Sequence, residues 1–408
     1  MIKKADSQLI RLLNERKILN LIRKEGPISK AALARRTHMS KVGAIDVINR
    51  LIQAGYVEEI GKGSSTSRGG KRPSMIKLNP NNHFVIGIEF KRREARIALA
   101  NIEAEIIGKK KIQYADESEP EKILDKIFKK IDGLLKMHTI DKNKLVSIGI
   151  GIPGLIDYYE GRLYFADTLK NWDTVLLGKI FTERYGVPAI LENDANTLAL
   201  GESILGAGRD HSSMVCIWTG DGVGSGVIID HKLVQGYSGS AGEVGYFEII
   251  DGKIDSRQLK HLYQGQKYFG GLLSESLLYR IMADRVMKDP GTDQKDADLI
   301  SLLKKAEHHQ GLQEILDEFA YVLASLCLTF IKVINPSIII LSGKVIENSS
   351  YLLEKIRLIL AEKSREASFI RSEVVMGELK DEAALRGAIA MALQIIFESE
   401  EISCPVYA

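Results

Sequence analysis

The sequence contains few cysteines and no apolar segment long enough to cross a membrane. Its three cysteines, Cys216, Cys327 and Cys404, are odd in number and too few to cross-link 408 residues, so we expect reduced thiols and a cytoplasmic location. The first residues are charged where a secretory signal would be apolar. The most apolar stretch, 319–334, carries Lys332 and is too short for a membrane span. We therefore expect a buried helix there and no membrane partner.

Excess positive charge is absent from most of the chain. Residues 1–82 contain 17 Lys and Arg against 6 Asp and Glu, a net charge of +11, whereas the remainder has 39 against 47, a net charge of −8. With 45% hydrophobic residues, the length suits two or three globular domains, which we place at 1–80, 81–200 and 201–408. A return of the last helix to the domain at 81–200 is the alternative for the end of the chain. A basic first domain on an acidic body suggests that the first domain binds a polyanion. A solvated basic surface is the alternative.

The first 80 residues have the pattern of a winged helix-turn-helix. The apolar periodicity and the turn residues predict three helices and then two strands, at 7–22, 30–36, 41–54, 56–60 and 75–78. Gly26-Pro27 ends the first helix. Ser29 and Ser40 precede the other two helices as N-caps, because their hydroxyls can accept hydrogen bonds from free backbone amides. Two capped helices joined by a short turn and followed by a wing are typical of DNA-binding domains.

The third predicted helix would enter the major groove with its first residues at the base edges. The candidate DNA contacts in and before it are Ser40, Lys41, Gly43 and Arg50, with Asp46 as a further candidate and Arg50 nearer the phosphates. The residues expected to pack inward are Ala44, Ile45, Ile48, Leu51 and Ile52. The loop between the two strands adds Arg68, Lys71 and Arg72, because an extended arginine fits the narrow, negative minor groove. A charged linker is the alternative interpretation of that loop.

The rest of the chain alternates strands with helices in two blocks. The first block has predicted strands at 84–90, 94–101, 106–113, 146–151 and 187–192, with a helix at 120–137. The second block has strands at 214–219, 226–229 and 337–341 and is otherwise mostly helical. This alternation predicts an α/β fold in two lobes.

Three motifs of this body carry a family resemblance. They are Gly149–Asp157, Glu192–Asn196 and Gly239–Gly245, and the element Gly69–Pro73 precedes them. In this order they resemble the signature of the ROK family of sugar kinases and sugar-responsive repressors, over nearly the whole chain. The resemblance implies a two-lobed, actin-like (ribonuclease H-like) body behind the winged helix. It also implies a homodimer or tetramer that binds palindromic operator DNA and a monosaccharide effector of the xylose, glucose or amino sugar class.

The family's kinases hold ATP phosphates with glycine loops, whose backbone amides can approach the oxygens closely. Here the first loop reads Glu89–Arg93 and has no glycine. The second, Gly220–Gly226, has Asp221 in place of a threonine, and that carboxylate would repel phosphate. The third, Leu341–Lys344, keeps only Gly343. Three altered loops favour a regulator that is not an enzyme and binds no nucleotide cofactor, while an active sugar kinase with a DNA-binding head is the alternative.

The sugar side of the resemblance is better preserved. By resemblance, Asn193, Asp194 and Glu243 bind sugar hydroxyls, and Asp194 matches the kinases' general base, a vestigial role without ATP. Helix capping is the alternative role of Asn193 and Asp194, because apolar helical positions follow them. Further candidates for the pocket are Gly154, Tyr246 and, more weakly, Trp172.

The structural zinc that ROK members commonly hold lacks its ligands in this sequence. The family's histidine position is Tyr246, and residues 260–273 contain no cysteine, so thiolate ligation there is impossible. His261 stands alone, and Leu273 occupies the place of the family's last sugar-binding glutamate. We therefore expect no metal, and a sugar-responsive transcriptional regulator, most simply a repressor, that binds its effector between the two lobes.

Overall fold

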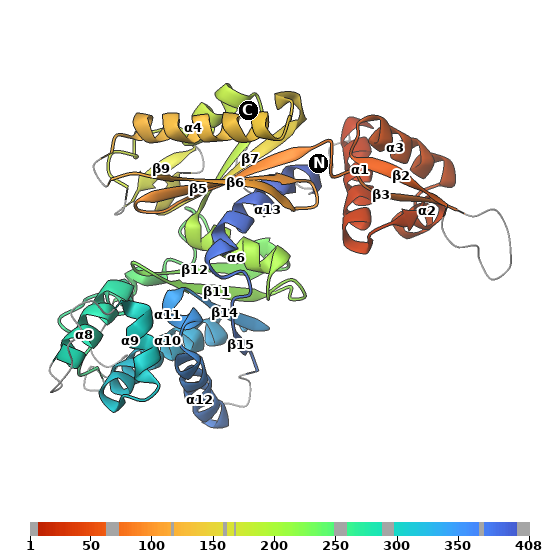
Figure 1. Ribbon diagram of the computed structural model, residues 1–408. Coiled ribbons are helices and arrows are strands. Elements are labelled where there is room, and N and C mark those ends of the chain that lie inside the picture. The colour runs from red at the N-terminus through yellow and green to blue at the C-terminus, as the bar shows by residue number, and fades with distance from the viewer. Residues whose placement is uncertain are drawn as a thin grey trace. The chain divides into compact units, whose positions relative to one another are not determined.

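The computed structural model describes residues 7–62, 73–115, 118–157, 161–166, 169–248, 259–287, 298–366 and 371–397. The chain forms two compact units, one of Met1–Glu192 with Ala388–Ala408 and one of Asn193–Gly387 (Figure 1). The three domains that we place at 1–80, 81–200 and 201–408 stay predictions.

Three helices and a three-stranded sheet build the basic head. The helices are α1 (Ser7–Glu25), α2 (Lys30–Thr37) and α3 (Lys41–Gln53), and the strands are β1 (Ile28–Ser29), β2 (Val57–Lys62) and β3 (Ser74–Leu78), in the order β1-β3-β2. Ser29 Oγ accepts a hydrogen bond from the Ala32 amide at 3.2 Å, and Ser40 Oγ accepts one from the Gly43 amide at 3.0 Å. Both serines therefore cap helices, and the predicted winged helix-turn-helix is confirmed.

The first body sheet has a fully buried central strand. Its strands are β4 (Phe84–Phe90), β5 (Glu94–Asn101), β6 (Ile106–Gln113), β7 (Leu145–Ile152) and β10 (Ala189–Asn193), in the order β10-β7-β4-β5-β6. Strand β4 runs parallel to β7 and antiparallel to β5, and all its residues are buried. Helix α4 (Pro120–Met137) lies along one face of the sheet (Figure 1), and α5 (Leu177–Tyr185) packs against α4 through the rings of Phe181 and Phe128. The hairpin of β8 (Leu155–Asp157) and β9 (Arg162–Phe165) adds Ile156 and Leu163 to the same core.

Trp172 belongs to the core of this first sheet. Its side chain is 1% exposed, and its ring meets the ring of Phe90 edge to face with centroids 5.2 Å apart. The interpretation of Trp172 as a pocket wall is therefore wrong, because the loop after Leu169 turns the indole inward instead of toward solvent.

The second body sheet carries helices on both faces. Its strands are β11 (Met214–Thr219), β12 (Val223–Ile229), β13 (Lys232–Leu233), β14 (Ile338–Ser342) and β15 (Glu373–Met376), in the order β13-β12-β11-β14-β15. The helices of this part are α6 (Asp194–Leu205), α7 (Phe269–Leu272), α8 (Glu275–Met287), α9 (Leu299–Ala306), α10 (Gln310–Val333), α11 (Lys344–Glu347), α12 (Ser350–Glu366) and the start of α13 (Ala383–Phe397). Figure 1 shows α6 on one side of the sheet and α8, α9, α10 and α12 on the other. The predicted α/β fold in two lobes is confirmed.

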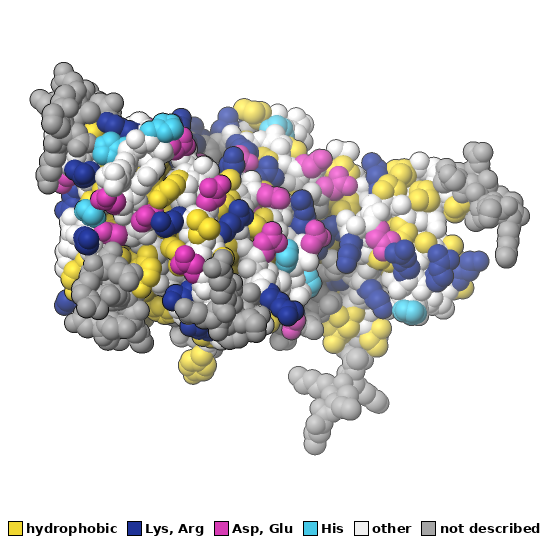
Figure 2. Space-filling view, turned by 90° about the horizontal axis from the view of Figure 1, so that it is seen from below, with side chains coloured by type: hydrophobic (Ala, Val, Ile, Leu, Met, Phe, Trp, Pro, Cys, Tyr) yellow, Lys and Arg dark blue, Asp and Glu magenta, His cyan; other side chains and the backbone are white. Residues whose placement is uncertain are grey.

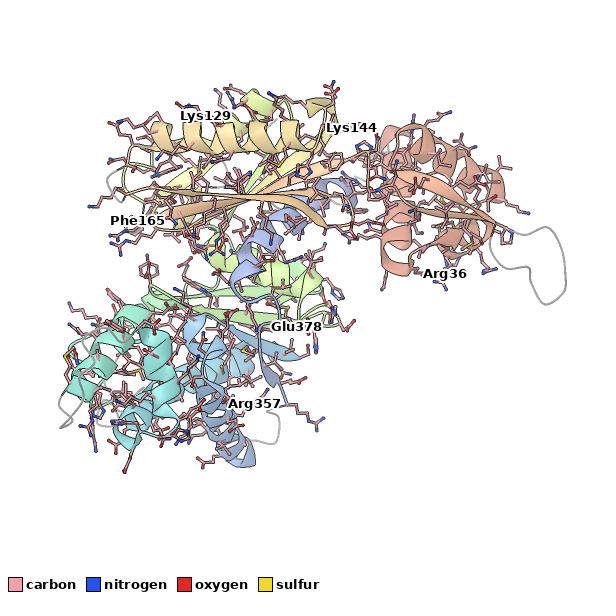
Figure 3. The ribbon with its side chains drawn as sticks, viewed as in Figure 1. Arg36, Lys129, Lys144, Phe165, Arg357 and Glu378 are labelled. Carbon is pink, nitrogen blue, oxygen red and sulfur yellow. The ribbon has the colours of Figure 1, made fainter. Side chains whose placement is uncertain are left out.

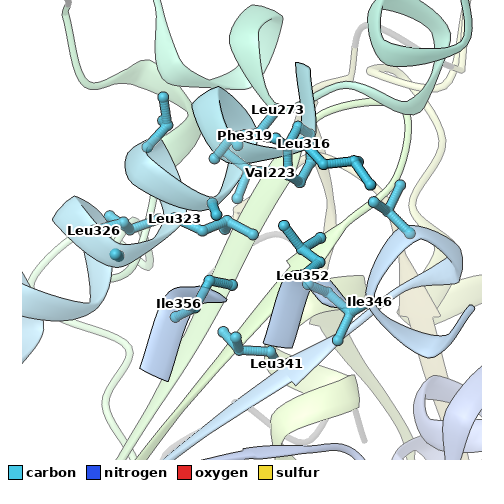
Figure 4. Close-up of a cluster of buried hydrophobic side chains, with 14 of the residues drawn as sticks. Val223, Leu273, Leu316, Phe319, Leu323, Leu326, Leu341, Ile346, Leu352 and Ile356 are labelled. Carbon is cyan, nitrogen blue, oxygen red and sulfur yellow. The ribbon is translucent and has the colours of Figure 1, made fainter. Parts of the chain in front are cut away.

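Helix α10 is the centre of the second core. Phe319 and Leu323 on this helix pack beside Leu341 of β14 and Ile356 of α12 (Figure 4). The expected buried helix is confirmed, and among the described helices none is long and apolar enough to cross a membrane.

Strand β12 begins three residues before the predicted strand at 226–229. The two glycines that suggest a loop, Gly224 and Gly226, let α6 lie directly on the strand. A Cβ at Gly224 would stand 2.9 Å from the Cβ of Ala195, and one at Gly226 would stand 2.4 Å from the Cβ of Ala199. Helix packing therefore explains both glycines without a bound phosphate.

A similar close approach joins α6 to the amino-terminal part of α13. A Cβ at Gly387 would lie 1.7 Å from the carbonyl oxygen of Thr197. We expect Gly387→Ala to lower the free energy of unfolding by about 1 to 3 kcal/mol, because the two helix backbones must move apart. Gly133→Ala on the exposed side of α4, where a Cβ meets nothing within 4 Å, is the control and should stabilise by about 0.5 to 1 kcal/mol. Urea denaturation of both variants measures the contrast, and equal effects would contradict it.

Candidate functional site

Helix α3 presents its first turn to solvent. Its buried face consists of Ala44, Val47, Ile48 and Leu51. Lys41 is exposed and forms no ion pair within the described residues, whereas the Ser40 hydroxyl is occupied by the cap. A Cβ at Gly43 would lie 3.1 Å from Ser40 Oγ, so the glycine fits the cap closely. The amino end of α3 therefore has the exposed geometry that a major-groove helix requires.

Two apolar side chains on the exposed side of α3 were not expected there. Ile45, which the sequence places among the packing residues, is 40% exposed, and Val42 is 79% exposed. The assignment of Ile45 to the core is wrong because the buried face runs through positions 44, 47, 48 and 51. A helical wheel centred on those positions would have placed Val42 and Ile45 outside. Exposed apolar groups at this end of the helix suit the methyl group of thymine.

Arg50 is engaged within the head. Its Nε donates to Glu15 Oε1 at 3.0 Å, and its guanidinium also pairs with Asp46, one turn earlier on α3. The hydrogen bond that Arg50 donates to Glu15 is the main reason that the pKa of Arg50 is raised. Arg50 and Asp46 stay candidate DNA contacts, and this network ties both to α1.

The head carries further exposed Lys and Arg side chains. Lys and Arg side chains gather on the face of the head that Figure 2 shows at the right. Arg35 and Arg36 project from α2 (Arg36 is labelled in Figure 3), and Arg36 pairs with Glu25. Arg35, like Lys41, is exposed and makes no ion pair with another described residue. The three candidate cations of the wing loop, Arg68, Lys71 and Arg72, lie outside the described residues.

Asn193 and Asp194 stand where β10 ends and α6 begins. Asn193 Oδ1 accepts hydrogen bonds from the amides of Ala195 at 2.9 Å and Asn196 at 3.3 Å, so Asn193 is the N-cap of α6. Asp194 Oδ1 also accepts from the Ala195 amide, at 2.9 Å. The helix start orients both side chains, so a capping role and a binding role are compatible.

Glu243 shares its surroundings with Asp194. The turn before it is held by Gly242, whose φ of +86° and close approach to the Ser225 carbonyl oxygen both require a glycine, and Ser225 Oγ donates to the Gly242 carbonyl oxygen at 2.7 Å. Burial, and then the neighbouring Asp194 carboxylate, raise the pKa of Glu243 to about 7. The structure thus brings together two acids that are 49 positions apart in the sequence.

The raised pKa of Glu243 predicts a stability change between pH 5 and pH 8. The folded protein holds this proton more tightly than the unfolded chain, whose carboxyl titrates near 4.5, so folding loses a favourable contribution as the pH rises through about 7. Glu243→Gln cannot lose that proton. We expect its stability relative to wild type to rise by about 1 to 2 kcal/mol over this range, allowing for solvent screening of a half-buried group. Urea denaturation at each pH measures it, and a constant difference between the two proteins would contradict it.

The other two sugar candidates lie on turns. Tyr246 follows Glu243 on the same short 3-10 turn and is 51% exposed. Gly154 belongs to the first unit, has a φ of +118°, and would place a Cβ 2.3 Å from the carbonyl oxygen of Phe165. The positive φ in the turn between β7 and β8, and the close approach to β9, therefore already explain Gly154.

The first two loops that match the kinases' nucleotide site carry groups unsuited to a phosphate. In the first loop, Phe90 is fully buried, and Lys91 pairs with Glu89 at 3.3 Å. In the second, Asp221 is exposed at the tip of the β11–β12 hairpin and helps to raise the pKa of Glu275, an effect caused mainly by burial.

In the third loop the exposed cation is Lys344, whose Nζ lies 4.0 Å from Glu275. Gly343 has a φ of +117°, and its amide donates to Glu347 Oε1 at 3.2 Å, within the short helix α11. In a phosphate-binding loop that amide would be directed at the ligand. The Gly343 amide is therefore already bonded to the Glu347 carboxylate and is not directed at a ligand.

Residues 260–273, where the family resemblance would place zinc ligands, are held by a carboxylate. Glu318 on α10 is 7% exposed and accepts hydrogen bonds from the backbone amides of His261 and Leu262 and from the His261 ring, whose Nδ1 lies 2.6 Å away. The donor set of residues 260–273 does not fit a thiolate metal site, since it contains no cysteine. Glu318 was not foreseen, because a glutamate within a long apolar helix gives no sequence signal of its partner.

Known protein families match both the head and the body of the chain. The family model described as ROK family matches residues 85–395, and the model described as winged helix-turn-helix DNA-binding matches residues 11–58. A xylose repressor of Caldicellulosiruptor bescii is 28% identical over 98% of this chain and 99% of its own.

Two solved structures show the same fold. A ROK family transcriptional regulator described as a homologue of the E. coli MLC protein has a TM-score of 0.80, 21% identity, and covers 96% of this chain and 98% of its own. A ROK family glucokinase of Streptomyces griseus has a TM-score of 0.58, 26% identity, and covers 76% of this chain and 99% of its own. The regulator structure thus spans almost the whole of this chain, whereas nearly the whole glucokinase matches 76% of it. With a family match over residues 85–395, the chain belongs to the ROK family.

Proposed function

We propose that this ROK-family DNA-binding regulator is a sugar-responsive repressor without kinase activity. Its α3 helix binds palindromic operator DNA, and the site around Asp194 and Glu243 binds a monosaccharide of the xylose, glucose or amino sugar class. It acts as a homodimer or tetramer. The observation that carries the proposal is the exposed first turn of α3 on the same chain as two electrostatically coupled acids that suit sugar hydroxyls.

The full-length similarity to a xylose repressor supports the regulatory role and makes xylose the first sugar to test. The ligand can change operator affinity only by binding more tightly to one of two conformations of the regulator. A sugar bound equally well by both would leave repression unchanged.

An active sugar kinase is the second candidate, because Asp194 is retained where the kinases have a general base and a glucokinase shares the fold. We disfavour it because Asp221, Glu275 and Glu347 place carboxylates at the nucleotide loops. Purified protein with D-xylose, D-glucose or N-acetyl-D-glucosamine is expected to show no sugar-dependent ADP release. ADP release that Asp194→Ala abolishes would overturn this part of the proposal.

The regulatory proposal is tested by operator binding with and without sugar. Random duplexes are first selected on the full chain, and the affinity of the selected operator is then measured by fluorescence anisotropy. We expect palindromic sequences and a change of at least about 5-fold in operator affinity at saturating levels of one of the three sugars. Selection of no consensus, or an affinity that no sugar changes, would contradict the DNA and the sugar part respectively.

A further inference from the structure

Glu318 is a buried carboxylate with three N–H donors around it. Its Oε2 accepts hydrogen bonds from the amides of His261 and Leu262, both at 2.9 Å, and its Oε1 lies 2.6 Å from His261 Nδ1. The side chain is only 7% exposed, in a helix that otherwise supplies apolar groups to the core. A buried carboxylate is tolerated when several charge-assisted hydrogen bonds replace its hydration. These three bonds therefore fix one short segment of chain to α10.

Apolar side chains also anchor the segment that Glu318 holds. Leu259 and Leu262 are buried in the second core, so the hydrogen bonds and the apolar contacts act on the same turn. Residues 260–273 contain no cysteine, so neither a disulfide nor thiolate ligation can fix this turn. The carboxylate of α10 fixes the backbone of this turn, and Arg280 of α8 adds a hydrogen bond to the side chain of Gln264 at 2.7 Å.

The anchored segment continues directly into the support of the candidate sugar site. Tyr268 forms a bridge with Glu248, and the amide of Phe269 donates to the carbonyl oxygen of Phe247 at 3.0 Å. A Cβ at Gly270 would come within 3.1 Å of the carbonyl oxygen of Gly245, so α7 lies against the turn that carries Glu243 and Tyr246. A shift of residues 262–270 would therefore move the turn at 243–248.

We propose that Glu318 is a positioning residue for sugar binding, which it serves by holding residues 259–272 against the turn of Glu243 and Tyr246. The inference rests on the proposed sugar site for its functional consequence. Its structural part, a connection from α10 through His261 to the turn, does not depend on which sugar binds. Glu318 itself touches no ligand and acts through the turn.

Glu318→Gln is the informative change because it keeps the shape of the side chain. The amide offers one acceptor and places an NH2 group opposite an N–H donor, so at least one of the three hydrogen bonds is lost. Asp317→Asn is the matched control, since Asp317 is the next residue on α10 and its carboxylate bonds Tyr351 and Lys355 of α12 instead. His261→Ala removes only the ring donor and keeps both backbone bonds to Glu318.

The first readout is native-state hydrogen exchange of the full chain without sugar. In Glu318→Gln we expect amides in 244–248 and 262–272 to exchange at least about 10-fold faster, with the rest of the second core unchanged. His261→Ala should show a smaller change in the same two segments, and Asp317→Asn should show none there. If Glu318→Gln does not fold, His261→Ala decides the question by itself.

The second readout is calorimetric binding of D-xylose, D-glucose and N-acetyl-D-glucosamine. Affinity for the bound sugar should fall at least about 5-fold in Glu318→Gln, while operator affinity without sugar stays at the wild-type value. Faster exchange in 262–272 with no change in 244–248 would overturn the proposal, as would an equal acceleration throughout the unit. If wild type binds none of the three sugars, the proposed sugar response fails for them, and the exchange data still decide whether Glu318 positions the turn.

Discussion

Removal of residues 1–81 is expected to lower affinity for the selected operator by at least about 1,000-fold. The deleted segment carries a net charge of +11 and the matched winged helix-turn-helix at residues 11–58, whereas the remainder carries −8 and would repel the phosphates. Residues 82–408 should retain at most weak, non-specific DNA binding. Fluorescence anisotropy measures the loss, and retention of a sugar-induced thermal shift is the control that the body is still folded. Operator binding equal to that of the full chain would contradict the assignment of DNA binding to the head.

A single substitution in the full chain tests how one lysine of the head contributes to DNA binding. If Lys41 contacts a phosphate, Lys41→Ala should reduce the slope of log affinity against log salt by about 0.9. Lys129→Ala removes the same charge from the exposed side of α4 in the body (Figure 3) and should leave the slope unchanged. Equal slopes for both variants would show that Lys41 neutralises no phosphate, which leaves the base edges as its only candidate contact.

Val42 tests whether the exposed apolar side of α3 reads bases. Loss of the side chain in Val42→Ala should weaken operators that carry thymine at one position and leave the others almost unchanged, because the methyl group of thymine is the apolar feature of the major groove. The expected discrimination is about 1 to 3 kcal/mol at that base pair. Selection of operators on wild type and variant compares the two, and identical consensus sequences would contradict the interpretation.

The fold was predictable where the signal is local. Caps at Ser29 and Ser40 follow from residue type and spacing, and the apolar runs of β4 and α10 follow from burial on both sides. Short elements such as β1 and β13, each of two residues, have no periodicity of their own and form because a neighbouring strand pairs with them. The start of β12 was missed because its glycines serve the packing of α6, which is a long-range cause.

The candidate site was predictable only as a set of residue types. Asp194 and Glu243 entered by family resemblance, and their electrostatic coupling comes from the pairing of distant segments within the second unit. Trp172 was misread because a large aromatic residue in a loop gives the same signal whether it points inward or outward. The partners of Glu318 could not be foreseen, because hydrogen bonds to backbone amides leave no trace in residue identity.

Substitution of either acid of the sugar site is expected to weaken sugar binding by about 10- to 100-fold. An ionised carboxylate accepts two hydroxyl donors, and each such charge-assisted hydrogen bond is worth about 1.5 to 3 kcal/mol. Asp194→Asn and Glu243→Gln keep the shape of the side chains but turn one acceptor into a donor. Calorimetry measures the loss, and operator affinity without sugar should stay at the wild-type value in both variants, because neither residue belongs to the head.

The two losses should not add, because the two acids interact. The charge of Asp194 contributes to the raised pKa of Glu243, so Asp194→Asn leaves Glu243 more fully ionised at neutral pH and a better acceptor. In Asp194→Asn, the stronger hydrogen bond to Glu243 offsets part of the binding free energy that the substitution removes. The double variant has no such compensation, so we expect its loss of binding free energy to exceed the sum of the two single losses. In all three variants the sugar should still change operator affinity by the wild-type factor once the site is saturated, if the coupling itself is intact. Unchanged sugar affinity in both single variants would show that this pair is not the sugar site, whereas lowered affinity with strictly additive losses would show two acids that bind sugar independently.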